Sequence, residues 1–330
     1  MTAPFCPAML LPIWKRLRGT PRPDGDVTAR RDMRVTPFWE SAMTIRNPIE
    51  WSGAQFVSAA HAASSFQRSI EHMQDTAHSP APTVRRISNA DVYRSLRQGF
   101  DDFTAYRSDV LFLCATYALV GLVMARLAFG MDLLPLLFPL ASGFAIVGPL
   151  AAVGLYEMSR MRERGMEVGW ANAFDVLKAP AVGGIAALGL LLIALFLVWL
   201  GTAWAIFQAT MGPTVPTAPM AFVNDVLFTA QGQTMIVVGV GVGFVFALLA
   251  MMMSVVSFPL LLDRDAGLDT AIRTSFRAVI ANPAPMALWG AIVAAALIAG
   301  SALFFVGLVV AVPVLGHATW HLYRKLVAPD

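Results

Sequence analysis

Polar and apolar residues divide the chain into a polar front and an apolar remainder. Charged side chains are dense before Arg107 and sparse after it, where long apolar runs cover residues 109–129, 133–156, 181–210 and 233–262. Each run is as long as the roughly 20 residues that a helix needs to cross about 30 Å of hydrocarbon. The pattern therefore predicts an all-α fold, a polytopic membrane helix bundle, with four clear transmembrane spans in this part of the chain.

The last apolar stretch, residues 286–320, contains no charged residue. As a single helix rising 1.5 Å per residue it would be about 52 Å long, which is longer than the bilayer is thick. A break near Gly300 and Ser301 gives two spans, 286–302 and 303–322, and predicts six transmembrane helices in all. One long tilted helix, or a helix with a re-entrant piece, is the alternative and would give five spans.

The front of the chain predicts two segments outside the membrane domain. Residues 1–42 mix Pro, Arg, Asp and Thr and predict a disordered extension, and Met43 is an alternative start to Met1. Residues 43–83 predict an amphipathic cytoplasmic helix and a linker, because apolar positions recur at three and four residues between 51 and 73. This helix either packs on the rest of the protein, or lies on the membrane surface or docks a partner. Residues 84–330 are expected to form the integral membrane domain.

The Lys and Arg residues indicate an orientation. They fill the loops after the second and fourth spans, whereas residues 211–232 contain none. Because basic loops stay in the cytoplasm, even-numbered loops are expected there, and Arg324 and Lys325 place the C-terminus there if the last stretch crosses twice. We therefore expect a multi-pass protein of a bacterial inner membrane with both termini cytoplasmic. The net charge is +3, but the sequence has no compact basic face for nucleic acid, so membrane lipids are the expected partners.

A weak internal repeat accompanies the spans. Similar segments precede the first, third and fifth spans, and their aligned aromatic residues are Phe100, Phe174 and Phe276. The even-numbered spans each contain a proline, which removes a helical hydrogen bond: Pro149, Pro259 and Pro313. Three units of amphipathic helix plus helical hairpin would form a pseudo-threefold bundle with kinks around a cavity. Chance is the alternative, because proline is common in membrane helices.

His317 and His321 are the cofactor candidates. They are four residues apart on one helix face, which is the spacing that lets two imidazoles reach one metal or a haem edge. A third ligand would have to come from Glu157, Asp263 or another protein, and we predict no bound cofactor. The alternative interpretation is that both histidines, with Trp320 and Tyr323, anchor the last span at the lipid headgroups.

Other motifs indicate structure rather than chemistry. Gly239 and Gly243 form a Gly-x-x-x-Gly pair that lets a neighbouring helix approach closely, and they lack the strand context of a dinucleotide site. Asp263 with Arg264, and Glu157 with Arg160, are expected to be ion pairs at helix ends. The sequence contains no catalytic motif, so we do not expect an enzyme.

The chain resembles the bacterial family called domain of unknown function 2189, whose members are integral membrane proteins sometimes labelled as similar to cytochrome c oxidase subunit I. The resemblance covers most of the chain from Met43 and is carried by the segments 43–51, 138–160, 254–265, 271–290 and 314–326. It does not imply oxidase activity, because haem-copper oxidases need histidines on several spans. The expected role is a non-catalytic structural, assembly or accessory component of another inner-membrane complex. The alternatives are a transporter or channel for a small or lipid-like solute, and haem or metal binding related to respiratory oxidases.

Overall fold

The computed structural model describes residues 76, 79–105, 134–212, 219–302 and 306–329. The predicted disordered extension, the predicted helix between residues 51 and 73, and the first predicted span at 109–129 lie outside the described residues. The elements below all belong to the unit that begins at Ala59.

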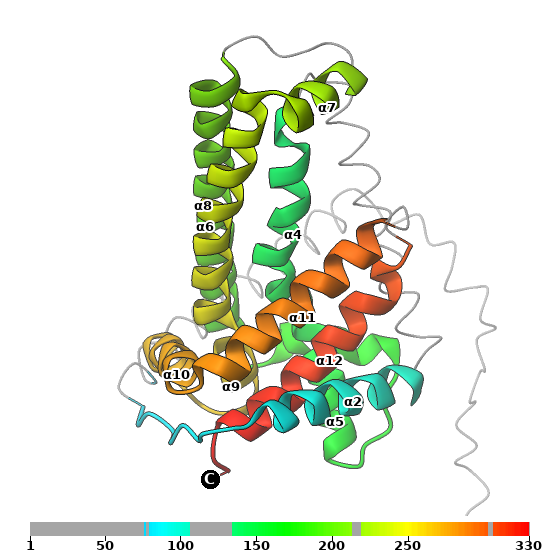
Figure 1. The fold of residues 1–330 in the computed structure, drawn as a ribbon. Coiled ribbons are helices and arrows are strands. Elements are labelled where there is room, and N and C mark those ends of the chain that lie inside the picture. The colour runs from blue at the N-terminus through cyan, green and yellow to red at the C-terminus, as the bar shows by residue number, and fades with distance from the viewer. Residues whose placement is uncertain (1–75, 77–78, 106–133, 213–218, 303–305, 330) are drawn as a thin grey trace, which may run out of the picture. The chain divides into compact units, whose positions relative to one another are not determined.

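The described residues form an all-α fold, as the hydropathy pattern predicts (Figure 1). Its elements are α2 Asn89–Ala105, η3 Leu134–Leu136, α4 Leu137–Ala151, α5 Val153–Glu163, η4 Trp170–Lys178, α6 Val182–Met211, α7 Pro219–Phe228, α8 Ala230–Ser254, α9 Ser257–Asp263, α10 Leu268–Ala281, α11 Pro283–Ala302 and α12 Leu308–Leu326.

Within the described residues, four helices are long and apolar enough to cross a membrane. They are Phe138–Glu163, Val182–Met211, Ala230–Asp263 and Pro283–Ala302, which correspond to the second to fifth predicted spans. The sixth predicted span, residues 303–322, coincides largely with α12, which is not among the four. The total of six spans therefore stays a prediction.

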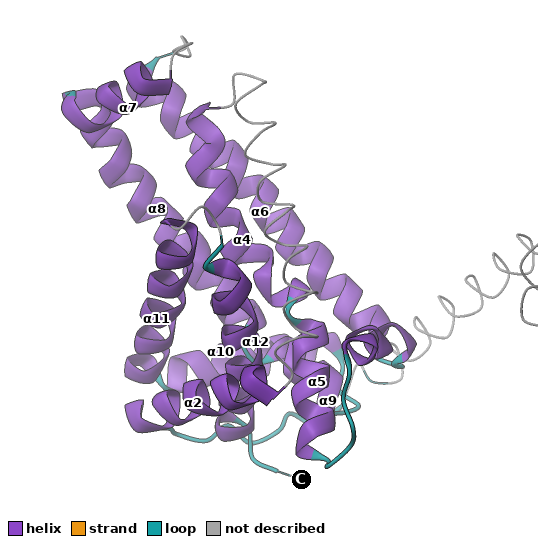
Figure 2. Ribbon diagram, turned by 90° about the vertical axis from the view of Figure 1, so that its right-hand side faces the viewer, coloured by secondary structure: helices purple, strands orange, loops and turns teal. Residues whose placement is uncertain are grey.

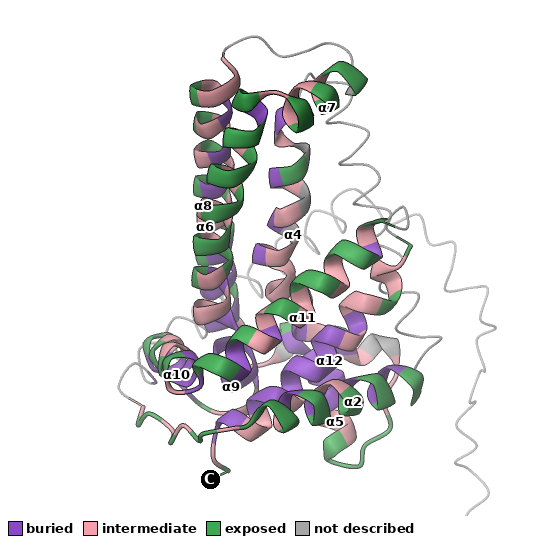
Figure 3. Cartoon of the chain, viewed as in Figure 1, coloured by how far each residue is buried: buried purple, intermediate pink, exposed green. Residues whose placement is uncertain are grey.

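The apolar helices leave much of their surface uncovered by protein. Of the most apolar stretch of Ala230–Asp263, only 6% is buried, and Val237 and Phe244 on α8 are 72% and 66% exposed. Figure 3 shows the same pattern along α8 and α11. Soluble proteins rarely expose apolar patches of this extent, whereas hydrocarbon tails solvate them without cost. The exposed apolar surface of these helices is therefore the kind of surface that contacts the lipid chains of a bilayer.

Two of the long helices are interrupted near the predicted prolines. The first interruption, at Ala152, follows Pro149 by three residues, and the second, at Val255 and Val256, precedes Pro259. A proline ring clashes with the carbonyl four residues earlier, which for Pro259 is that of Val255. At this interruption the Val256 N–H donates to Ser275 Oγ of α10 at 3.2 Å. By contrast, α12 continues through Pro313.

The last apolar stretch forms two helices, α11 and α12, so the predicted break near Gly300 and Ser301 is confirmed. Two glycines face each other where the hairpin turns. A Cβ added to Gly307 would lie 2.7 Å from Gly300 Cα, and a Cβ added to Gly300 would lie 3.0 Å from the backbone nitrogen of Leu308. Only glycine permits so close an approach of the two helices.

One end of the bundle is rich in polar side chains. Here α5, α9, α10 and the C-terminal half of α12 meet, and α2 lies along α12, whereas α7 lies at the opposite end of α6 and α8 (Figures 1 and 2). We call the first region the polar end. The three segments of the proposed repeat form α2, η4 and α10, which are 17, 9 and 14 residues long and differ in helix type. The pseudo-threefold repeat stays a prediction.

Asn282, at the junction of α10 and α11, attaches the segment before α2 to the polar end. Its side chain accepts a hydrogen bond from Ile87 N at 2.8 Å and donates one to the carbonyl of Arg85 at 3.1 Å. The residue is 2% exposed. The Asn282 amide therefore makes a hydrogen bond to each of these two backbone groups, at a position that water barely reaches.

Replacing Asn282 with Ala is expected to lower the free energy of unfolding by about 1–2 kcal/mol, because two part-buried hydrogen bonds, to the backbone groups of Ile87 and Arg85, are lost. Thermal unfolding of the purified protein in mild detergent, followed by circular dichroism, measures the loss. Asn89→Ala, at an exposed position that begins α2, is the matched control. Equal unfolding temperatures for the two variants would contradict the role assigned to Asn282.

Candidate functional site

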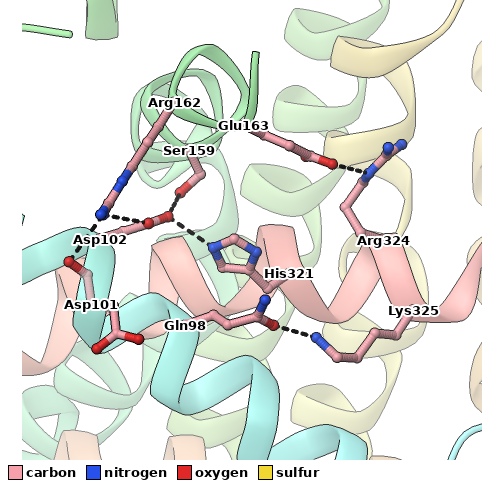
Figure 4. A pocket seen from close by; sticks show the side chains of 9 residues that line it. All are labelled: Gln98, Asp101, Asp102, Ser159, Arg162, Glu163, His321, Arg324 and Lys325. Atoms are coloured by element: carbon pink, nitrogen blue, oxygen red, sulfur yellow. Dashed lines mark hydrogen bonds and ion pairs between the residues drawn. The ribbon is translucent and has the colours of Figure 1, made fainter. Parts of the chain in front are cut away.

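The polar end contains a buried cluster centred on Asp102 of α2. Asp102 Oδ2 accepts a hydrogen bond from Ser159 Oγ at 2.6 Å and contacts His321 Nε2 at 2.8 Å. Its other oxygen, Oδ1, pairs with Arg162 Nη1 at 2.7 Å. The cluster thus joins α2 to α5 and to α12 through one carboxylate (Figure 4).

The surroundings of Asp102 favour its charged form. The residue is 6% exposed, and burial alone would raise its pKa. Hydrogen bonds from His321 and Ser159, together with the charges of the two histidines, outweigh that effect and lower the pKa of Asp102 below its ordinary value of 3.8. The carboxylate is therefore ionised throughout the physiological range.

His317 extends the cluster into the core. Its Nδ1 lies 2.8 Å from Ser159 Oγ. The single hydroxyl proton of Ser159 is donated to the Asp102 carboxylate, so the hydroxyl oxygen is left to accept from the protonated Nδ1 of His317. The Nε2 of this fully buried ring has no hydrogen-bond partner among the described residues.

The cluster brings Ser, His and Asp together but does not form a catalytic triad. In a triad one imidazole bonds the serine through one nitrogen and the carboxylate through the other. Here the carboxylate contacts Ser159 and the second histidine, His321. Ser159 is 1% exposed, and its hydroxyl is already engaged by Asp102 and His317. The geometry is that of a network that joins helices, in which His317 Nε2 is the atom without a partner among the described residues.

A second network links α5, α9 and α12. Arg324 Nε contacts Glu163 Oε1 at 3.0 Å and its Nη1 contacts Asp263 Oδ2 at 3.2 Å. Tyr323 Oη donates to the same oxygen of Asp263 at 2.8 Å, and burial and Asp263 raise the pKa of Tyr323, so the phenol stays protonated. The indole of Trp320 donates to Glu163 Oε2 at 3.0 Å.

The predicted helix-end ion pairs occur in this region. Glu157 Oε1 and Arg160 Nη2 are 2.7 Å apart, and Arg160 also donates to the carbonyl of Leu262 on α9. Arg264 Nε lies 3.9 Å from Asp263 Oδ2, which is a weaker contact. Arg160 therefore connects the end of α5 to α9.

A cavity of about 390 Å³ opens beside the cluster (Figure 4). Its lining carries both signs of charge, with Arg162, Arg324 and Lys325 opposite Asp101, Asp102 and Glu163. Both arginines already pair with carboxylates, and Lys325 donates to Gln98. The positive and negative side chains of the lining therefore largely balance each other, so the cavity shows no preference for an anionic or a cationic ligand.

A second cavity, of about 420 Å³, lies between α4, α6, α7 and α8 and is lined by apolar side chains. Neither of these two cavities is lined by Pro149, Pro259 or Pro313. Pro259 and Pro313 are buried in the polar end and in α12, respectively. The cavity proposed around the three prolines stays a prediction.

The two glycines of the predicted packing pair have different surroundings. A Cβ on Gly243 would lie 3.0 Å from Cη2 of Trp199, so the indole ring of this α6 residue packs against Gly243. A Cβ on Gly239 would have open space within 4 Å, and Gly239 lines the apolar cavity instead. The close helix approach expected at this pair stays a prediction.

The residues expected at the lipid headgroups are buried in protein, and this interpretation was wrong. Trp320 is 0% exposed, Tyr323 is 1% exposed and His317 is 0% exposed. The reason is that α2 and α5 cover this part of α12. His321 Nε2 contacts Asp102, and the described residues contain no group of three His, Cys, Asp or Glu side chains that could hold a metal ion. Cys114 lies outside the described residues.

Sequence reasoning missed Asp102 and Ser159. A signal for Asp102 was present, because the buried positions of α2 recur at three and four residues and include it: Val92, Ser95, Gly99, Asp102 and Phe103. An acidic residue in phase with a buried stripe requires a partner. Its partners are 57 and 219 residues away, so local patterns did not identify them.

Comparison with known families agrees with the membrane character of these helices. The family model described as "Predicted integral membrane protein (DUF2189)" matches residues 137–263, from α4 to α9. No curated protein and no solved structure matches the chain. The stated resemblance is therefore confirmed for the segments 138–160 and nearly all of 254–265, while the segments outside the match stay predictions. The chain is a membrane protein that matches the DUF2189 family through residues 137–263.

Proposed function

We propose that the protein is a non-catalytic accessory or assembly component of a membrane complex, and that α2 contacts its partner. The observation that carries the proposal is an apolar stripe on α2, formed by Tyr93 and Phe100, which are 58% and 51% exposed. They are seven residues apart, so they lie on one side of the helix, away from its buried stripe. Exposed aromatic side chains outside the membrane spans are typical of protein interfaces.

The chemistry of the polar end supports a binding role over a catalytic one. The carboxylates of Asp102, Asp263 and Glu163 are used in contacts between α2, α5, α9 and α12. Such contacts fix the geometry of a rigid support. Among the described residues, they leave the aromatic stripe of α2 exposed.

We also propose a bacterial inner membrane as the location, with the polar end and the C-terminus in the cytoplasm. Arginines gather at the polar end, whereas residues 211–232, which include α7, contain neither Lys nor Arg. Basic residues stay on the cytoplasmic side of such membranes. The backbone of Ala328 pairs with Thr83 at the polar end, so this end and the end of the chain share one side.

The test is native electrophoresis of the protein extracted from its own membranes in mild detergent. We expect a complex larger than the chain and its bound detergent, which the double variant Tyr93→Ser with Phe100→Ser depletes at least tenfold. The matched control is Arg94→Ser with Asp101→Ser, two exposed polar positions on the same helix. Recovery of the chain alone, or of copies of the chain only, would refute the accessory role. Equal depletion by both double variants would refute the assignment to the aromatic stripe.

A further inference from the structure

The cavity between α4, α6, α7 and α8 is lined by apolar residues. Trp199, Ala203, Phe222, Ile236 and Gly239 contribute to this lining. The one polar atom of Trp199, its indole N–H, donates to the carbonyl of Pro139 at 3.2 Å and to Ser142 Oγ at 3.1 Å. No polar side chain of the described lining is therefore left for a polar ligand, and the site fits a hydrocarbon.

The cavity opens sideways along the apolar surface of the helices. Phe138 of α4 and Val240 of α8, both in the lining, are 64% and 55% exposed. These helices belong to stretches long and apolar enough to cross a membrane. The medium that reaches the opening is therefore the acyl region of the bilayer, in which lipid chains are present at very high concentration.

The size and position of the cavity agree with a lipid chain. Its volume of about 420 Å³ is within the roughly 300–1,000 Å³ of sites that hold small molecules. Its polar boundary is α7, where the exposed Asn224 follows the cavity-lining Val223. A chain extending from this boundary would lie along the cavity-lining residues of α6 and α8, beside Trp199.

We propose that this cavity binds one acyl chain of a membrane phospholipid, which enters from the bilayer between α4 and α8. Binding is driven by the fit of the chain against Trp199, Phe222 and Ala203, since an acyl chain gains little hydrophobic energy by moving from lipid to protein. The bound lipid fills the space that would otherwise separate α7 from α4. This inference does not depend on the proposed partner role of α2.

Two glycines of α8 provide a matched pair of variants. A Cβ on Gly239 or on Gly241 meets nothing within 4 Å, so both positions accept a larger side chain. Gly239 lines the cavity, whereas Gly241, about 200° further round the helix, does not. Gly239→Leu therefore fills the cavity, and Gly241→Leu adds the same atoms to the outer surface.

The test uses phosphatidylethanolamine with a diazirine in one acyl chain, incorporated into vesicles with the purified protein. After irradiation, labelled residues are mapped by mass spectrometry. We expect label on cavity-lining residues of α6 and α8, reduced at least fivefold by Gly239→Leu and unchanged by Gly241→Leu. Label spread equally around α8, or unaffected by Gly239→Leu, would overturn the proposal. Unfolding temperatures of both variants separate a filled cavity from a misfolded protein.

A disulfide assay tests the other possible occupant, the apolar segment 109–129, which contains Cys114. In a chain with Cys6→Ser and Ile236→Cys, oxidation that joins Cys114 to position 236 would assign the cavity to this segment and overturn the lipid site. Failure to form this bond, together with the photolabel on the lining, supports the lipid chain.

Discussion

Replacing Asp102 with Ala is expected to destabilise the polar end by about 2–4 kcal/mol, toward the range measured when one partner of a buried ion pair is removed. The carboxylate holds three groups from two helices: Ser159 and Arg162 of α5 and His321 of α12. Ser159 is 1% exposed and would keep a hydroxyl proton without a carboxylate to accept it. The Arg162 side chain is 36% exposed and can turn to water, which limits the loss.

The neighbouring acid supplies the control for this prediction. Asp101 is exposed and borders the same cavity, but its side chain does not join the three helices, so Asp101→Ala is expected to leave the unfolding temperature nearly unchanged. Asp102→Asn keeps the shape of the side chain and removes its charge, so an intermediate loss is expected. Unfolding in mild detergent, followed by circular dichroism, measures all three variants. Equal stability of Asp102→Ala and Asp101→Ala would show that the cluster does not hold the helices together.

A double-mutant cycle identifies the contact that carries the stability. Asp102 and His321 belong to different helices and are 219 residues apart in sequence. If their contact is made in the folded protein, the losses of Asp102→Ala and His321→Ala should differ from additivity by about 0.5–3 kcal/mol. Strict additivity would assign the stability to other partners of Asp102.

The membrane helices were predictable because the bilayer imposes one strong requirement on sequence. A spanning helix must be apolar for about 20 residues, and this rule located α6, the stretch formed by α8 and α9, and α11 within a few residues. Length alone predicted the break between α11 and α12, since one helix would overshoot the membrane. The structure adds the glycines that make the turn, Gly300 and Gly307.

The polar end was predicted less well, because its contacts join residues far apart in sequence. Aromatic and histidine residues at the end of an apolar run are typical of a headgroup anchor, and this pattern led to the wrong environment for Trp320 and Tyr323. Aromatic residues such as Trp320 and Tyr323 are equally common in a protein core, where another helix buries them. Only the three-dimensional packing of α2 on α12 distinguishes the two cases.

The contact that makes this packing so close is Gly99 of α2 against Ala318 of α12. A Cβ on Gly99 would lie 2.4 Å from the backbone nitrogen of Ala318 and 2.7 Å from its Cα. These are backbone atoms, so no change of rotamer can make room for a methyl group. Nor can α12 move away, since a Cβ on Gly316 would lie 2.6 Å from Leu155 of α5 on its other side. The helix is held between two neighbours, and α2 itself must shift.

Gly99→Ala is therefore expected to destabilise the polar end by about 1–3 kcal/mol, the usual range for extra atoms in a well-packed core. Gly201→Ala provides a control of opposite sign, because Gly201 lies in α6 where a Cβ meets nothing within 4 Å. There the better helix propensity of Ala is expected to stabilise the protein by about 0.5–1 kcal/mol. Unfolding temperatures in detergent measure both. Adding Ala318→Gly to Gly99→Ala should restore only part of the stability, because the backbone clash remains, and full restoration would show that the two helices can separate freely.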